Sequence, residues 1–273
     1  MMHILLAGLG AGVAAALLFA SMASGVPLSL FLAFLAPLPI MIVALGWSHW
    51  AALMATATAA AILGAVFGAE LAAVFLIFGG VPAWWLGYLA LLGRPRANGG
   101  AAQMEWYPPG RLYLWATLSG AAVTAAALVA FWGDDTAMRQ SLKSNLDLIM
   151  GPDAPQLPAE LSGIDPDLLV EMMVRVLPPA VAVTVGLIQI ADLWLAGQVV
   201  RLSGRLQRPW PDLSAVSFPL LAAALYGATL AGAFLPGVAG IIGGLFAATL
   251  TFAFAMVGFA VVHTLTRGMQ GRT

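Results

Sequence analysis

Two polar residues, Gln189 and Asp192, lie inside an apolar stretch of this chain and are well placed to do chemistry. Their spacing of three positions puts both side chains on one face of a helix. Asp192 precedes the expected helix end at Val200 by about eight residues, or roughly 12 Å. A carboxylate at that depth in a membrane costs on the order of 2.5–3.5 kcal/mol on insertion scales unless it is protonated, paired or hydrated. His263 has a similar expected depth in another helix, so an Asp192–His263 contact is geometrically possible.

These three residues allow two interpretations. One is structural, with polar contacts that hold helices together, and the other is a site for a substrate or a proton. The sequence contains no G-x-S-x-G, H-E-x-x-H or P-loop pattern. The histidines are isolated from other ligand types, and the absence of cysteine excludes thiol chemistry and thiolate metal sites. We therefore expect a non-enzymatic protein with no catalytic residue, metal site or cofactor.

The composition indicates what kind of protein positions these residues. Hydrophobic residues make up 62% of the 273 residues and charged residues 8%, and the mean hydropathy is +0.96. Soluble domains carry about 25% charged residues. The net charge of −1 gives no reason to expect a nucleic-acid partner. A spanning helix needs about 20 mostly apolar residues, and such stretches lie near 4–22, 28–46, 51–68, 70–92, 112–132, 175–200, 218–235 and 239–266.

The sequence thus predicts an all-α, polytopic transmembrane helix bundle of about eight helices. We expect a single integral membrane domain (1–273) in contact with the lipid bilayer. The first apolar stretch has no basic region before it, although residues 20–24 resemble a small-residue cleavage site. We expect this stretch to be a retained helix rather than a signal peptide.

The distribution of charge predicts the orientation of the bundle. The segment of about 133–174 carries eight Asp and Glu residues against only Arg139 and Lys143. Lys and Arg favour the cytoplasmic side of a membrane, so we expect both termini in the cytoplasm and the acidic segment in the periplasm. The basic residues behind this orientation form three clusters: Arg94, Arg96 and Arg111; Arg201, Arg205 and Arg208; and Arg267 and Arg272.

Short helices are expected within the acidic segment. The Asp134-Asp135 pair can cap a helix that runs to about Met150, with apolar residues at helical spacing. Asp165-Pro166 is a typical helix start. This second helix should continue into the sixth spanning helix, with a bend at Pro178-Pro179.

Proline and glycine residues predict irregular spanning helices. Pro37 and Pro39 interrupt the second apolar stretch, and Pro82 follows Gly79-Gly80 in the fourth. Broken helices at membrane depth are tolerated where the backbone lines a cavity or is buried in protein. We expect a cavity bounded by the second, fourth and sixth helices that suits a small ligand, with Trp84 and Trp85 as an apolar wall. Ordinary kinked packing is the alternative.

The first helix carries two ridges of small residues, because a spacing of four places each set on one face. The ridges consist of Ala7, Ala11 and Ala15, and of Gly8, Gly12 and Ala16. Such ridges let another backbone approach closely. They predict either packing within the bundle or docking of a partner membrane protein.

Three motifs resemble the YybS-like family of bacterial multi-pass membrane proteins. They are Trp106-Tyr107-Pro108-Pro109-Gly110-Arg111, Val176-Leu177-Pro178-Pro179 and Gly258-Phe259-Ala260-Val261-Val262-His263. That family is similar to the substrate-binding subunits of energy-coupling-factor vitamin transporters and to the membrane component of the rod-shape machinery. The resemblance implies a bacterial cytoplasmic (inner) membrane protein. It also implies docking of a transmembrane coupling protein, since Ala7, Ala11 and Ala15 match the ridge that the transporter subunits use.

The leading functional hypothesis is a non-enzymatic, small-molecule-binding protein that resembles a transporter substrate subunit. Its expected ligand-binding residues are Gln189, Asp192, His263, Trp84 and Trp85, and its expected docking residues are Ala7, Ala11, Ala15, Gly8 and Gly12. The alternative is a membrane scaffold that binds other membrane or cell-envelope proteins and carries no ligand.

The orientation can be tested with reporter fusions along the chain. Fusions near residues 100, 207 and 272 should report from the cytoplasm, and a fusion at residue 155 should report from outside, because the basic clusters stay on the cytoplasmic side. A cytoplasmic signal from residue 155 would overturn the whole assignment.

Overall fold

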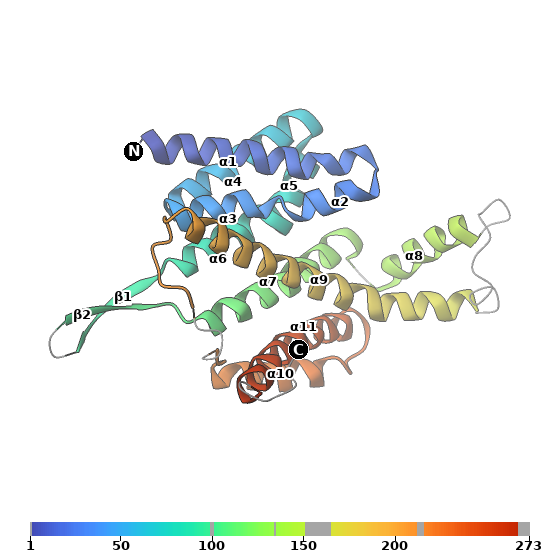
Figure 1. Ribbon diagram of the computed structural model, residues 1–273. Helices are drawn as coiled ribbons and strands as arrows, with labels where there is room; N and C mark the ends of the chain where they lie inside the picture. Colours follow the sequence, from blue (N-terminus) through green and yellow to red (C-terminus); the bar gives the residue numbers. More distant parts are fainter. Residues whose placement is uncertain (1, 99–100, 134, 151–164, 212–215, 267–273) are drawn as a thin grey trace.

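The computed structural model describes residues 2–98, 101–133, 135–150, 165–211 and 216–266 (Figure 1). Its helices are α1 (Met2–Ala20), α2 (Pro27–Phe34), α3 (Pro37–Gly46), α4 (His49–Phe67), α5 (Ala69–Phe75), α6 (Val81–Ala90), α7 (Pro109–Trp132), α8 (Asp135–Met150), α9 (Pro166–Leu202), α10 (Leu220–Gly232) and α11 (Gly237–Leu265). A 3-10 helix (Ser21–Ser24) follows α1, and a π-helix (Leu76–Gly80) joins α5 to α6. Strands β1 (Gly93–Asn98) and β2 (Ala101–Trp106) form an antiparallel hairpin.

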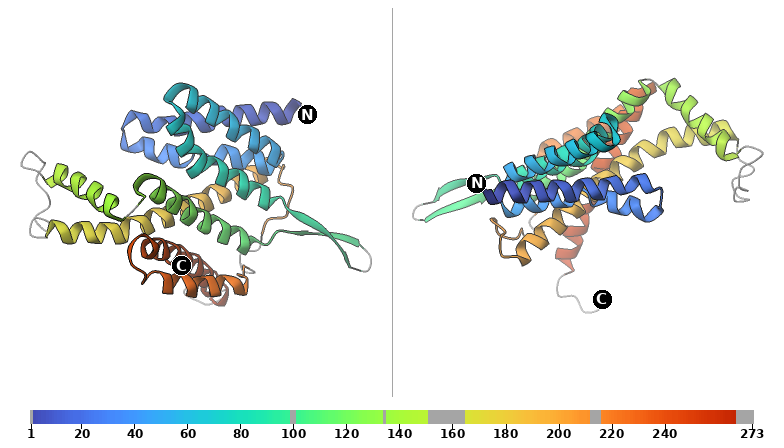
Figure 2. Two further views of the ribbon diagram at one scale, coloured as in Figure 1. Left: turned by 180° about the vertical axis from the view of Figure 1, so that it is seen from behind. Right: turned by 90° about the horizontal axis from the view of Figure 1, so that it is seen from above.

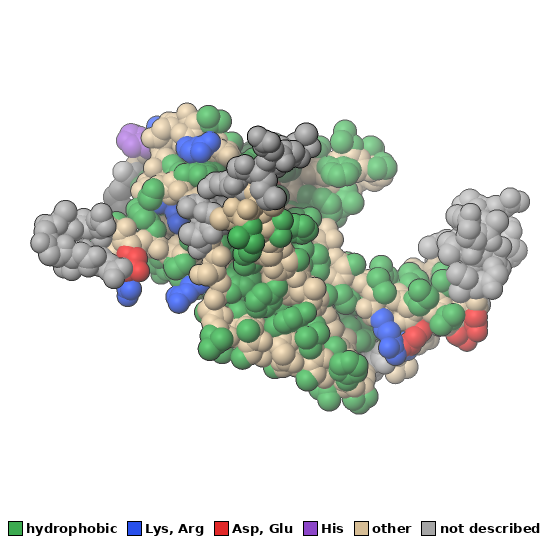
Figure 3. Space-filling model, turned by 60° about the horizontal axis from the view of Figure 1, so that its bottom comes forward, with side chains coloured by type: hydrophobic (Ala, Val, Ile, Leu, Met, Phe, Trp, Pro, Cys, Tyr) green, Lys and Arg blue, Asp and Glu red, His purple; other side chains and the backbone are tan. Residues whose placement is uncertain are grey.

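The structure confirms an all-α bundle of membrane-spanning helices. Within the described residues, seven helical stretches are long and apolar enough to cross a membrane. The seventh expected helix corresponds to α10, which is apolar but shorter than the others. On the face shown in Figure 3, hydrophobic side chains cover the middle of the molecule and charged side chains lie toward its two ends. The cytoplasmic placement of the termini stays a prediction.

Helix α9 is the axis of the bundle. It contacts α3, α6, α7, α8 and α11, and it runs along most of the molecule between the β-hairpin at one end and α8 at the other (Figures 1 and 2). We call the end that carries β1 and β2 the hairpin end. Arg201 and Arg205 lie there, at and just after the end of α9. Basic residues near a helix C-terminus also interact favourably with the helix dipole.

The second and fourth expected helices are both irregular, as the prolines and glycines predict. The second is divided into α2 and α3, with Leu35 and Ala36 between them and Pro37 in the first turn of α3. The fourth consists of α5, the π-helix and α6, with Pro82 in the first turn of α6. A proline at a first helical turn is tolerated because the N–H that it lacks has no partner within the helix there. The helices therefore restart at these prolines instead of running straight through them.

The ridges of α1 face the bundle and pack against α4. A Cβ added to Gly8 would lie 2.9 Å from the Ala51 carbonyl oxygen, and one added to Gly12 would lie 2.6 Å from the Ala55 carbonyl oxygen. Ala15 is fully buried, and Ala7 and Ala11 are partly buried against the same core. Packing within the bundle therefore accounts for Gly8, Gly12 and Ala15, and docking of a partner at the partly buried Ala7 and Ala11 stays a prediction. A partner helix cannot reach Gly8 or Gly12 while α4 is in place.

The acidic segment contains the two expected helices. The Asp165 side chain caps α9 by accepting a hydrogen bond from the Asp167 amide at 3.0 Å. Met138 and Leu146 of α8 pack against Val170 and Val174 of α9. α9 then continues through Pro178-Pro179 as one helix. Ion pairs join the two helices, between Arg139 and Glu171 and between Lys143 and Asp167.

The β-hairpin of residues 93–106 was not expected from the sequence. Gly93 pairs with Trp106 and Arg94 with Glu105, whose side chains also form an ion pair at 2.8 Å. β1 has the sequence Gly-Arg-Pro-Arg-Ala-Asn, which lacks the β-branched and aromatic residues that favour strands. The β1 sequence therefore gives no signal in strand propensity, which is why the hairpin was not expected.

The close contact between α1 and α4 predicts a difference between two glycines of α1. Gly12→Ala places a methyl group 2.6 Å from Ala55 O and Thr58 Cβ, whereas nothing lies within 4 Å of a Cβ at Gly10. Gly12→Ala should therefore lower the free energy of unfolding by roughly 1–3 kcal/mol. Gly10→Ala should leave it unchanged or raise it, because alanine favours the helix. Thermal unfolding of both purified variants in the same detergent checks this; equal midpoints would contradict the packing of α1 on α4.

Candidate functional site

A cavity of about 220 Å³ lies where the two irregular helices meet α9. Its lining includes Pro37, which follows the break between α2 and α3. Phe78 and Gly79 of the π-helix and Ile188 and Gln189 of α9 also line it. Phe19 and Met22 add a wall from the end of α1. The cavity is bounded by the second, fourth and sixth expected helices, as the sequence predicted. Apart from Gln189, its lining side chains are apolar.

Gln189 is the polar group of this cavity. Its side chain is 1% exposed, and its Oε1 accepts a hydrogen bond of 2.5 Å from the Ser119 hydroxyl of α7. That bond fixes the amide so that Nε2 is the free donor. Among the described residues, Nε2 has no hydrogen-bond partner. Gln189 therefore brings a buried NH2 group without a described partner to the lining of the cavity.

Asp192 lies one turn further along α9 and is buried in the interior of the bundle. It is 1% exposed, and its Oδ2 has no hydrogen-bond partner in the described part of the chain. It does not line the 220 Å³ cavity. No polar partner for the Asp192 Oδ2 is thus seen among the residues described, and Asp192 and Gln189 have different surroundings despite their shared face.

His263 is not brought together with these two residues. It is exposed on α11 and lines a separate groove of about 690 Å³, together with Tyr113 and Thr117 of α7. Asp192 is buried and does not line that groove. An equal distance from the helix ends does not bring the two side chains together. Asp192 is instead buried within the bundle, whereas His263 is exposed on α11 and lines the groove.

Trp84 and Trp85 belong to an aromatic cluster, not to the wall of the 220 Å³ cavity. Trp84 stacks on Tyr88 with ring centroids 6.3 Å apart, and Trp85 meets Trp115 of α7 edge to face at 5.9 Å. His49 of α4 approaches Tyr88 at 5.3 Å. The expected apolar wall is instead formed by phenylalanine and aliphatic side chains. The cluster links α6 to α4 through Tyr88 and to α7 through Trp85.

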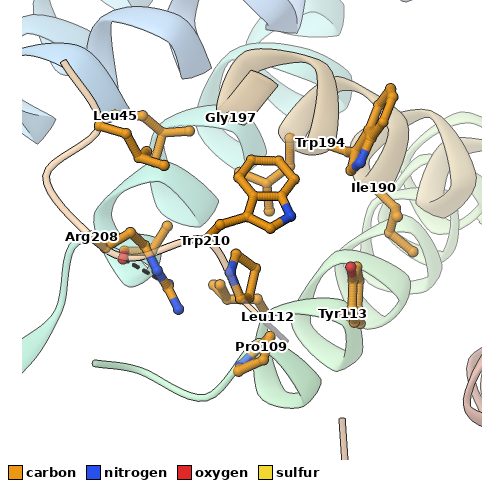
Figure 4. A pocket seen from close by; sticks show the side chains of 13 residues that line it. Leu45, Pro109, Leu112, Tyr113, Ile190, Trp194, Gly197, Arg208 and Trp210 are labelled. Atoms are coloured by element: carbon orange, nitrogen blue, oxygen red, sulfur yellow. Dashed lines mark hydrogen bonds between the residues drawn. The ribbon is translucent and has the colours of Figure 1, made fainter. Parts of the chain in front are cut away.

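A third, smaller space of about 70 Å³ surrounds Trp210 near the hairpin end (Figure 4). Arg208 lines it and donates hydrogen bonds to the carbonyl oxygens of Ala90, at 3.0 Å, and Tyr107, at 3.3 Å. Burial lowers the pKa of the Arg208 guanidinium. This arginine therefore fastens the segment after α9 to the end of α6 and the start of α7. The sequence indicated only a basic cluster here, because the carbonyl partners come from distant parts of the chain.

Comparison with known proteins identifies a family and no individual relative. The family model described as "Predicted membrane protein (DUF2232)" matches residues 13–270, nearly the whole chain. No curated protein and no solved structure matches. The finer likeness to transporter subunits stays a prediction.

The unpaired carboxyl group of Asp192 predicts an unusual effect on stability. An unsatisfied buried polar group costs about 1–3 kcal/mol, so Asp192→Leu should raise the free energy of unfolding by roughly that amount. Asp167→Leu is the matched control, since Asp167 is exposed and pairs with Lys143; it should give no increase. Thermal unfolding in detergent measures both variants. A lower midpoint for Asp192→Leu would show that Asp192 has a stabilising polar partner.

Proposed function

This chain belongs to the DUF2232 family of predicted membrane proteins, and we propose that it binds a small, mostly apolar molecule within the membrane without transforming it. The ligand occupies the 220 Å³ cavity and accepts a hydrogen bond from Gln189. Gln189 lines this cavity, and its buried Nε2 has no hydrogen-bond partner among the described residues; these two facts together carry the proposal. A buried donor without a partner is costly, and a ligand acceptor would satisfy it.

The backbone around the cavity supports a binding role. The break between α2 and α3 and the π-helix both contribute to its lining. Irregular backbone at membrane depth is tolerated where it lines a cavity or is buried in protein, and π-segments within helices are frequent at functional sites. Because both irregular segments line the same cavity, we infer that their shape serves ligand binding and is not an accident of helix packing.

The lining of the cavity limits the chemistry and the size of the ligand. Gln189 is the only residue among those lining it whose side chain carries an amide, and an amide is a poor general acid or base. Binding therefore suits this cavity better than catalysis. Its volume of about 220 Å³ lies below the roughly 300–1,000 Å³ of typical ligand pockets. The ligand should be small, with one hydrogen-bond acceptor.

A transporter substrate subunit is the more specific form of this proposal. It requires a coupling protein in addition to a ligand. The small-residue ridges of α1 give limited support, because Gly8 and Gly12 already contact α4. A coupling protein would therefore have to bind another surface of α1 or another helix.

A membrane scaffold is the second candidate function. α8 and the first turns of α9 form a pair of helices that projects from the bundle, at the end opposite to the β-hairpin (Figure 2). Hydrophobic packing between Met138 and Val174 and two interhelical ion pairs hold the two helices together. A projecting helix pair of this kind could present a surface to a cell-envelope protein. This function needs no ligand in the cavity.

Native mass spectrometry of the protein purified from its own membranes tests the proposal. The wild type should retain one adduct lighter than a phospholipid. Gln189→Leu should lower the occupied fraction at least about fivefold, because the acceptor of the ligand then loses its donor. Gly79→Val should also lower it, since a Cβ at Gly79 makes only ordinary contacts, the nearest at 3.5 Å, and fills cavity space.

The matched control is Gly10→Val, which adds the same group at a position where nothing lies within 4 Å. This variant should keep the adduct. A wild-type protein without any such adduct, or an adduct equally retained by Gln189→Leu, would reject the proposal. A chain that carries no adduct but binds a protein partner in a one-to-one ratio would favour the scaffold function instead.

A further inference from the structure

We propose that the groove between α7 and α11 binds one anionic phospholipid, with an acyl chain in the groove and the phosphate beside Arg201 at the hairpin end. The groove has a volume of about 690 Å³, within the roughly 300–1,000 Å³ of pockets that bury a ligand of substantial size. It is distinct from the 220 Å³ cavity, and the two spaces share none of their lining residues.

The groove arises because α11 packs tightly at one point and diverges from α7 beyond it. Leu245 of α11 is fully buried against Ala121 of α7 and Ala182 of α9. Further along α11, Met256 is 40% exposed and Phe259 is 72% exposed. Figure 2 shows α11 at a steep angle to α7 and α9. The space between the diverging helices is therefore open to the surrounding bilayer along its side.

The inner surface of the groove matches a hydrocarbon chain over most of its length. Ile190 of α9 lies at its base, and Ala253, Val257 and Phe218 are among the apolar residues of its walls. An acyl chain gains no hydrophobic free energy when it moves from the bilayer into an apolar groove, because both surroundings are equally apolar. The shape of the groove holds the chain, and the headgroup must supply the selectivity.

Positive charge lies next to one end of the groove. Trp210 lines the groove, and the guanidinium of Arg201 lies over its indole ring, 4.4 Å from the ring centroid. Arg201 is exposed. Tryptophan favours the headgroup level of a bilayer, where an exposed arginine attracts anionic lipid by about 1 kcal/mol. This charge complementarity favours an anionic phospholipid over a neutral one.

The occupant should be a bilayer lipid, not a helix of another protein. Helix–helix contacts in membranes use small residues that let backbones approach. On the exposed side of this groove, α11 presents the large side chains of Met256 and Phe259. A flexible chain can fit between such side chains more readily than a rigid helix.

Native mass spectrometry with added lipid tests this site. The delipidated full-length protein is titrated with phosphatidylglycerol or with phosphatidylcholine that carries the same acyl chains. One phosphatidylglycerol should be retained severalfold better than phosphatidylcholine. Arg201→Gln should lower phosphatidylglycerol retention about fivefold and phosphatidylcholine retention less, because choline offsets the charge of its phosphate. Ala260→Phe, which adds bulk inside the groove, should lower the retention of both lipids.

Matched controls separate the groove from general effects of charge and bulk. Arg94→Gln removes the same charge from the β-hairpin, and Ala57→Phe adds the same bulk on the exposed side of α4; neither should change lipid retention. If Ala260→Phe unfolds, Met256→Trp replaces it, because Met256 is already 40% exposed. Equal retention of the two lipids by the wild type would overturn the proposal. So would equal losses in the groove variants and the controls. A small-molecule adduct at the 220 Å³ cavity would be unaffected by either result.

Discussion

The structure depends on one constraint, which is that backbone N–H and C=O groups in hydrocarbon must find partners within the protein. Continuous helices such as α4 and α7 satisfy it by themselves. The segments at residues 35–36 and 76–80 interrupt the regular ladder, and both face the cavity beside α9. The bundle therefore shelters its irregular backbone from lipid. That shelter places a cavity next to the buried side chain of Gln189.

Close helix packing provides this shelter. Gly8 and Gly12 let α1 approach the backbone of α4, and Gly120 lets α7 approach α9 at Ala182 and Gly186. Hydrophobic attraction between helices is weak in lipid, so van der Waals packing at small residues has to bring them together. The contact between α7 and α9 also sets the position of Ser119, whose hydroxyl orients the Gln189 amide. The polar group of the cavity thus depends on a glycine contact one position away along α7.

α9 separates the spaces that could hold different molecules. Gln189 lines the apolar cavity on one side, and the neighbouring Ile190 lines both the groove beside α11 and the small space around Trp210. Asp192 lines none of these three spaces. A ligand in the cavity and a lipid in the groove would therefore contact adjacent residues of one helix. At the hairpin end, Arg208 holds the segment after α9 in place. This fixes Trp210 between the groove and the small 70 Å³ space, both of which it lines.

The sequence by itself determined seven of the eight expected spanning helices, two irregular points within them and the helices of the acidic segment. These features follow from the length of apolar stretches, from prolines that cannot donate a backbone hydrogen bond, and from the Asp165 cap, all of which act locally. It also located the cavity and Gln189. Only the tertiary structure decided that Gly8 and Gly12 of α1 pack against α4, that Trp84 and Trp85 stack away from the cavity, and that Asp192 is buried while His263 lines the groove. The β-hairpin likewise has no signal in strand propensity. Each of these outcomes depends on how helices rotate and tilt against one another, and spacing along one helix does not specify which neighbour its faces meet.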